Sequence, residues 1–211
     1  MNKIKETGRS MIEMISVLAV IGVLSAGGLK GYTKAMHKYR VHKSITYVTD
    51  AIVEYQSFLK RPIGNYPSES ATMAENAQKY GLLSTCKIGT SEIAGASYQV
   101  CRFALGEVYP RFFMTTKEDG VYYTYMLYAT FTKDRENACV DFLNYRWDQV
   151  VPQKFWRRGK LWLTSNHGDR VMYSAKINKL NLTDIQQACS TYCEPQAAYC
   201  SVVFDLTTLG Y

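Results

Sequence analysis

An apolar run near the amino terminus leaves few folds open to this chain. The run begins at Met11 and ends at Leu29, and Glu13 is the one charged residue among its nineteen members. A helix of about 20 apolar residues spans the hydrocarbon core of a bilayer. We therefore expect residues 9–35 to form the hydrophobic, transmembrane half of a helix in a membrane-inserted or exported chain.

The residues that follow predict a second, amphipathic half of the same helix. Apolar side chains recur at spacings of 4, 3, 4, 3 and 4, at Val41, Ile45, Val48, Ile52, Tyr55 and Leu59. This spacing gathers them in one stripe along a helix. No proline interrupts residues 9–59, so one helix of 51 residues would be about 75 Å long. We expect its stripe to contact the core of a globular head.

The rest of the chain predicts an α+β head, residues 36–211, with an antiparallel β-sheet packed on the helical stripe. Strand patterns occur at residues 98–105, 121–131, 161–165, 171–176 and 201–206. Short helices are expected at residues 71–80, 136–145 and 183–190, the last capped by Thr183 or Asp184. The length of 211 residues, 47% of them hydrophobic, is typical of one such domain.

All six cysteines lie in the expected head, at Cys86, Cys101, Cys139, Cys189, Cys193 and Cys200. An even number after an export segment favours disulfides in an oxidising compartment. Zinc is the competing use, but the last three cysteines lack a C-x2-C pair and have no histidine near them. We therefore expect neither a metal site nor a cofactor.

Six cysteines allow 15 pairings, so their number alone leaves the connectivity open. Local closure favours Cys86 with Cys101. A bridge from Cys139 to Cys189 would join two expected helices and would leave Cys193 for Cys200.

Catalytic motifs do not emerge from the sequence. The three histidines, His37, His42 and His167, are too scattered to suggest a metal triad or a nucleophile–base pair, and His167 is expected in a turn. Four tyrosines are dense in one strand pattern, and half-buried packing is favoured over an adhesive surface: Tyr122, Tyr123, Tyr125 and Tyr128. We therefore expect that this chain is not an enzyme.

The chain has a formal net charge of +7, and a basic segment follows the apolar run. It contains Lys30, Lys34, Lys38, Arg40 and Lys43, with no acid before Asp50. Such a segment binds anionic lipid head groups or nucleic acid, or is a solvated helix face outside the membrane. Without interleaved stacking motifs, the solvated face is the favoured interpretation, and nucleic acid is not the expected partner.

The position of Glu13 separates three interpretations of the amino terminus. A secretory signal would be cut at a small-residue site such as residues 25–28, and a plain anchor would not be cut. Both leave unexplained an acid that costs about 2.5 to 3.5 kcal/mol at the bilayer centre. In the third interpretation, Gly8, Met11, Ile12 and Glu13 resemble the class III signal of type IV prepilins and pseudopilins.

This resemblance implies that a prepilin peptidase cuts after Gly8 on the cytoplasmic side and methylates the new amino terminus at Arg9. Residues 1–8 would be the leader. Arg9 departs from the phenylalanine or other apolar residue that the family usually has there. The resemblance also implies that Glu13 pairs with the terminal amine of a neighbouring subunit, which sets the axial register between subunits.

The same resemblance implies a structural role. The precursor would cross the inner membrane once, with its head outside the cytoplasm, and an assembly platform with its ATPase would build homo- or hetero-oligomeric filaments on the cell surface. A pseudopilin of a type II secretion system is the alternative within the family. An exported binding protein or enzyme on a simple anchor is the alternative of another class, and Gly8 with Glu13 argues against it.

Overall fold

The computed structural model describes residues 7–60, 74–93, 95–118, 120–152, 155, 160–174 and 181–209. Contacts divide the chain into two compact units, Met1–Arg40 and Val41–Tyr211. The expected division between residues 35 and 36 concerns the membrane boundary and stays a prediction. Each unit is described by itself.

The single long helix expected from the sequence is confirmed. Helix α1, Thr7–Phe58, is 52 residues long, about 78 Å at 1.5 Å per residue. It continues without interruption through Gly27 and Gly28. The predicted stripe is also confirmed, because Val48, Ile52 and Tyr55 are fully buried in the second unit.

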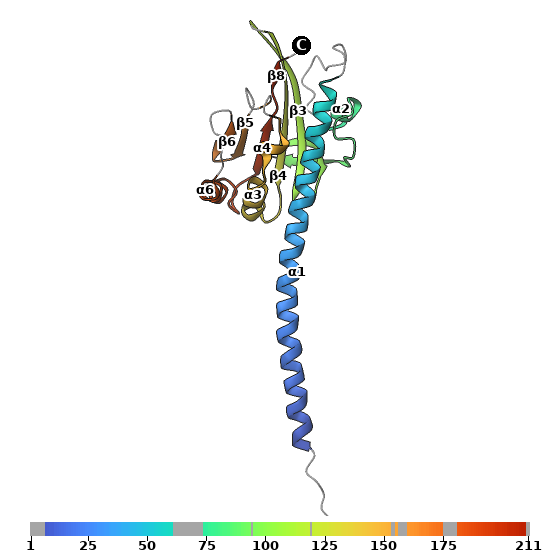
Figure 1. Cartoon of the computed structure of the whole chain (residues 1–211), viewed down its shortest axis with the longest axis vertical. Helices are drawn as coiled ribbons and strands as arrows, with labels where there is room; N and C mark the ends of the chain where they lie inside the picture. The colour runs from blue at the N-terminus through green and yellow to red at the C-terminus, as the bar shows by residue number, and fades with distance from the viewer. Residues whose placement is uncertain are drawn as a thin grey trace, which may run out of the picture. The chain divides into compact units, whose positions relative to one another are not determined.

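The second unit contains the expected antiparallel sheet (Figure 1). Its strands are β1 (Ile88–Ile93), β2 (Ala96–Arg102), β3 (Gly106–Lys117), β4 (Gly120–Phe131), β5 (Lys160–Ser165), β6 (Gly168–Ser174), β7 (Cys200–Asp205) and β8 (Thr208–Leu209). The order across the sheet is β1-β2-β3-β4-β7-β5-β6, and β8 also pairs with β4. Together with α1, this sheet confirms the α+β class.

Shorter helices accompany the sheet in the described part of the chain: α2 (Ala74–Lys79), α3 (Arg135–Leu143), α4 (Trp147–Val150) and α6 (Leu182–Tyr192). The expected cap of the last helix is wrong. The N-cap is Asn181, the residue before Leu182 at the start of α6. The Asn181 Oδ1 accepts a hydrogen bond from the backbone N–H of Asp184 at 2.7 Å. The Asn181 Nδ2 donates to the Asp184 carboxylate at 2.5 Å, which completes a reciprocal cap.

The core lies on one face of the sheet, between the strands and the helices α1, α3 and α6. Aromatic rings join these layers. Tyr55 of α1 stacks on Tyr125 of β4 with ring centroids 4.7 Å apart. Phe142 of α3 lies edge-on to Phe204 of β7 at 6.1 Å, and the buried Trp147 donates its indole N–H to the Phe142 carbonyl at 2.8 Å. The amphipathic half of α1 is therefore an integral part of the head.

The opposite face of the sheet carries an aromatic row. Tyr109 of β3 pairs in register with Tyr128 of β4, and their rings stack at 4.4 Å. Tyr128 is followed in register by Val203 of β7 and then by Trp162 of β5. Tyr98 of β2 adds a ring 5.0 Å from Tyr109. Tyr122 is buried, Tyr125 is buried in the core, and Tyr128 is half-buried, so these three tyrosines pack against the head as predicted. The side chain of Tyr123 lies outside the described residues.

Several elements depart from the sequence-based expectation. The strand expected at residues 98–105 ends at Arg102, because the Phe103 N–H donates to the Gly106 carbonyl at 2.9 Å and turns the chain into β3. A Cβ on Gly106 would lie 1.9 Å from the Thr130 carbonyl oxygen, so only glycine fits there. Strands β1, β3 and β8 and helix α4 were not expected. Residues 71–73 and 175–176 of the expected elements lie outside the described residues.

The structure contains the three disulfides that the expected pairing gives. The bridges are Cys86–Cys101, Cys139–Cys189 and Cys193–Cys200, with Cα–Cα distances of 5.4, 5.8 and 5.0 Å. Cys139–Cys189 joins α3 to α6, as expected for a bridge between two helices. The first bridge ties the segment before β1 to β2.

Candidate membrane and assembly segment

The predicted cleavage site lies in the first turn of α1. Helix α1 starts at Thr7, so the backbone of Gly8 and Arg9 is helical. Residues 1–6 of the expected leader and the Arg9 side chain lie outside the described residues. Cleavage after Gly8 and methylation of Arg9 stay predictions.

The apolar side chains of α1 are exposed along the whole run. Every residue from Met11 to Ala35 is exposed, and the large apolar side chains up to Leu29 are between 53% and 74% exposed. Within the described residues, α1 from Met11 is the one helix long and apolar enough to cross a membrane. An apolar surface of this extent requires a cover of lipid or of other protein chains.

Glu13 lies at the start of this apolar surface. Its side chain is exposed, and its carbonyl accepts a hydrogen bond from the Ser16 hydroxyl at 2.9 Å. The helical backbone places Arg9 and Glu13 four residues apart, about one turn along the same side of α1. When the surface around it is covered, the carboxylate loses water and needs a cation or several hydrogen bonds.

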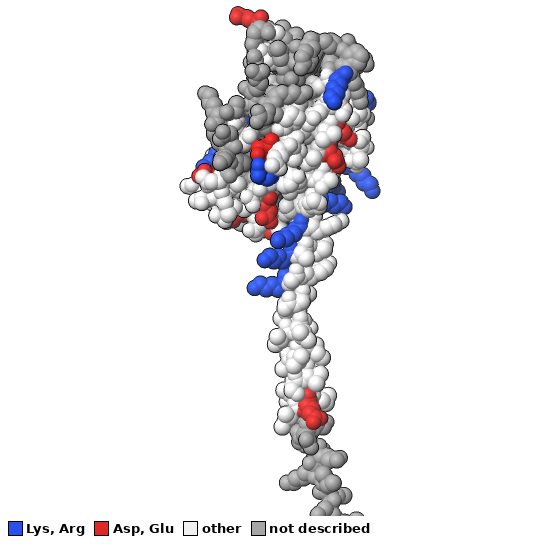
Figure 2. Space-filling model, in the orientation of Figure 1, with Lys and Arg blue, Asp and Glu red and all other residues white. Residues whose placement is uncertain are grey.

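Basic side chains follow the uncharged stretch of α1 (Figure 2). Lys30, Lys34 and Lys38 recur every four residues and are all exposed. Tyr32 lies between the first two lysines and is 63% exposed. We call the three lysines the lysine stripe. Arg40 is the last residue of the first unit, and Lys43 belongs to the second.

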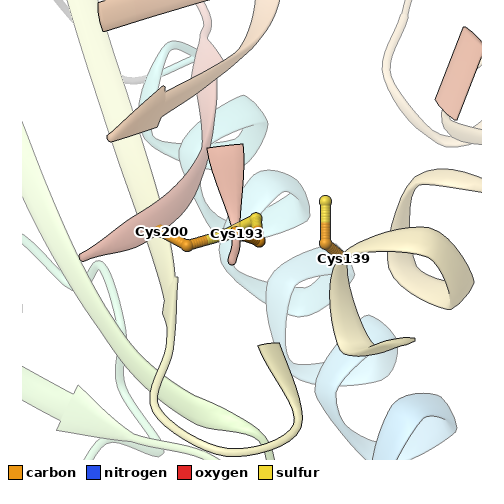
Figure 3. Close-up of side chains that lie close together, drawn as sticks. All are labelled: Cys139, Cys193 and Cys200. Carbon is orange, nitrogen blue, oxygen red and sulfur yellow. A yellow bond between two sulfur atoms is a disulfide. The ribbon is translucent and has the colours of Figure 1, made fainter. Parts of the chain in front are cut away.

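A cluster of cysteines is the one group of potential metal ligands in the part of the chain that the structure describes. The Sγ atoms of Cys139, Cys193 and Cys200 lie within 4.8 Å of one another in the buried core (Figure 3). All three sulfurs are in disulfides, and Cys189 completes the group as the partner of Cys139. A disulfide sulfur is not the thiolate that binds zinc. The oxidised cluster is therefore a covalent crosslink between α3, α6 and β7.

The histidines lie in separate places. His167 is in the turn between β5 and β6, as predicted, and its Nε2 lies 2.7 Å from Oε1 of Glu194. This contact ties the turn to the segment between α6 and β7. His37 and His42 are both on α1.

Asp205 is a buried acid that the sequence analysis missed. It ends β7 with 7% of its surface exposed, and the Thr207 hydroxyl donates to its carboxylate. The Thr207 hydroxyl also lies 3.1 Å from that of Thr124 on β4. Burial raises the pKa of Asp205, and the hydrogen bond from Thr207 and the charge of Lys160 partly offset the rise. The available signal was an acid inside an expected strand.

The chain matches no protein-family profile, no curated protein and no solved structure. Its own features establish an amino-terminal apolar helix that continues into a disulfide-bonded α+β head. This combination indicates a single-pass or exported protein with its head outside the cytoplasm.

Proposed function

We propose that this chain is a prepilin, the precursor of a structural subunit of a type IV pilus or a related surface filament. One observation carries the proposal. A continuous helix begins beside Gly8, bears an acid five residues later in an exposed apolar surface, and ends as part of the core of a disulfide-bonded head. A simple anchor explains the apolar surface but gives Glu13 no use.

In this proposal, a prepilin peptidase removes residues 1–8 and leaves Arg9 with a free, then methylated, amine. The new amine is a cation at the tip of the apolar helix. Because α1 is one helix, Glu13 lies about one turn from that tip, about 6 Å along the axis. Peptide bond cleavage therefore creates the partner that the acid needs.

Assembly then buries the apolar half of α1 against neighbouring subunits. In that low-dielectric bundle, Glu13 pairs with the terminal amine of an adjacent subunit, since an unpaired buried carboxylate costs several kcal/mol. The pair favours one axial offset over others. The partners of the subunit are other pilins, the peptidase, and the inner-membrane platform and ATPase. The subunit itself has no catalytic role.

A pseudopilin of a type II secretion system is the second candidate, because Gly8, Glu13 and α1 serve it equally well. A pilus subunit and a pseudopilin differ in the length of the filament that they form. Electron microscopy of the native cell surface separates them, with long surface filaments containing this chain favouring the pilus and a short periplasmic assembly favouring the pseudopilin.

Processing provides the direct test. Mass spectrometry of the mature protein should give a chain that begins at Arg9, with a methylated amine, and Gly8→Val should leave the precursor uncut. Gly22→Val is the matched control, because an added Cβ at Gly22 meets nothing within 4 Å. It should be processed normally. A mature terminus near Gly28 would overturn the proposal in favour of a secreted protein.

Assembly provides the second test, at Glu13. Glu13→Leu removes a charge from the apolar segment, so insertion and cleavage should persist while filaments fail and processed subunits accumulate in the membrane. Sheared filaments and membranes are separated and probed for the protein. Asp50→Leu, which removes an exposed acid from the second half of the same helix, should assemble normally. A normal filament yield from Glu13→Leu would return the segment to the plain-anchor interpretation.

A further inference from the structure

The lysine stripe lies on one side of α1. Residues four apart on a helix are neighbours, so Lys30, Lys34 and Lys38 form a row about 12 Å long. All three are exposed, and no acid lies between Glu13 and Asp50 to neutralise them. The row is therefore a one-sided cationic surface.

The position of the stripe along α1 matches the surface of a bilayer. The nineteen residues from Met11 to Leu29 extend about 28 Å as a helix, close to the hydrocarbon thickness of about 30 Å. Lys30 is the next residue, and Lys34 lies about 6 Å further, within a head-group layer about 5 to 8 Å thick. Lys38 lies one turn beyond, and a long lysine side chain reaches back toward the lipid phosphates.

Tyr32 supports the same depth independently. Tyrosine is enriched at membrane interfaces, where its ring lies among the head groups and its hydroxyl reaches water. Tyr32 is two residues past Lys30, is 63% exposed, and lies in the first unit, outside the core of the head. Cationic and aromatic side chains therefore mark one level of α1.

We propose that the lysine stripe binds anionic phospholipid head groups in the non-cytoplasmic leaflet and fixes the depth of the subunit in the membrane. This inference rests on the proposed membrane-inserted precursor. The lipid phosphates are the occupant that the geometry favours, because the stripe begins where the apolar surface ends. The stripe lies at the depth of the lipid head groups, which is not where a nucleic acid would bind.

The test measures lipid selectivity around the full-length precursor reconstituted in vesicles. Tyr32→Trp places a fluorophore at the depth of the stripe, about half a turn around α1 from Lys30 and Lys34. The fluorescence of the parent chain is subtracted to remove the native tryptophans. Quenching by brominated phosphatidylglycerol is compared with quenching by brominated phosphatidylcholine. Each lysine near an anionic surface contributes about fivefold in affinity, so we expect phosphatidylglycerol to be favoured at least about fivefold at low salt. The preference should fall as salt screens the charges.

The variant Lys30→Gln/Lys34→Gln/Lys38→Gln should lose the preference, and the corresponding triple arginine variant should retain it. The matched control, Lys79→Gln/Lys87→Gln/Lys133→Gln, removes three exposed lysines from the head and should keep the preference. Equal quenching of Tyr32→Trp by both lipids would overturn the inference. So would an unchanged preference when the three glutamine substitutions are added to Tyr32→Trp. So would binding of a labelled DNA duplex to the stripe in vesicles that show no lipid preference.

The vesicle measurement needs neither cleavage nor assembly. Normal filaments from a chain without lipid preference would remove this inference and leave the proposed function intact. A lipid preference in a chain whose mature terminus lies near Gly28 would remove the proposed function alone.

Discussion

Asp205 lies in a buried environment that disfavours the ionised form of its carboxyl group. It accepts a hydrogen bond from the Thr207 hydroxyl and feels the charge of Lys160, yet burial dominates and raises its pKa above the ordinary 3.8. The folded chain therefore holds a proton on Asp205 at pH values where the unfolded chain has released it. Ionisation of Asp205 above its raised pKa weakens the head at neutral pH.

We predict that Asp205→Asn raises the melting temperature of the fragment 36–211 at neutral pH. Because the native state binds more protons, the free energy of unfolding of the parent should fall as pH rises from about 4 through the raised pKa, and then level off. The variant should lack that fall. Calorimetry of the parent and of the variant across pH measures the melting temperature and the free energy of unfolding.

Asp148 supplies a control of opposite sign. A bidentate contact of Arg146, with both N–O distances 3.1 Å, lowers the pKa of Asp148. Stability from this pair is present above the ordinary aspartate pKa and is lost as pH falls through the lowered value. Asp148→Asn should therefore lower the melting temperature slightly at neutral pH. A rise in both variants would contradict the role assigned to burial at Asp205.

At the scale of elements, the disulfides and α1 define the head. Cys139–Cys189 links α3 to α6 across a separation of 50 residues, whereas Cys86–Cys101 and Cys193–Cys200 close separations of 15 and 7. In the chain-entropy account, a bridge destabilises the unfolded chain more when it closes a longer loop. The three bridges therefore differ in what they contribute.

Paired serine substitutions should follow the order of loop length. Loss of Cys139–Cys189 should lower the free energy of unfolding by about 4 kcal/mol, loss of Cys86–Cys101 by about 3, and loss of Cys193–Cys200 by about 2. Urea unfolding of the fragment 36–211 measures each value. Equal losses from all three pairs would show that strain or packing, and not loop entropy, decides their contribution.

The elements that the sequence predicted well are those with strong periodic patterns. The 4-3 spacing identified the buried side of α1, and runs of apolar, β-branched and aromatic residues identified β4, β5 and β7. Strand β1 was missed because its middle has no apolar side chain, at Gly89, Thr90, Ser91 and Glu92. The strand forms because it pairs with β2. Strand β3 contains Pro110, which argues against a strand, yet it pairs with β4 over its whole length.

The candidate segment was predicted by the same local signals. Gly8, Glu13 and the apolar run are neighbours in sequence, so their spacing is visible without a structure. Asp205 and the aromatic row depend on residues from several strands, which only the register of the sheet brings together. Long-range contacts of this kind leave no local pattern.

At the scale of the whole molecule, we expect the redox state of the compartment to decide whether the head folds. Five of the six cysteines are buried and all six are bridged, so reduced thiols would leave the core without its crosslinks. We predict that residues 36–211 accumulate as soluble protein when exported to a bacterial periplasm and aggregate in a reducing cytoplasm. Soluble yield and thiol titration measure this, and a host with an oxidising cytoplasm should restore the yield. Six free thiols in soluble exported protein would contradict it.

The same bridges limit how far the head lengthens under a pulling force. A residue drawn out of a fold adds about 3.3 to 3.6 Å of chain, but tension that reaches a disulfide passes through the sulfurs and bypasses the enclosed loop. The bridge between Cys139 and Cys189 alone withholds 50 residues, about 170 Å of potential extension. The three enclosed loops cannot add to the length of the head under such a force, so any lengthening has to come from the residues outside them.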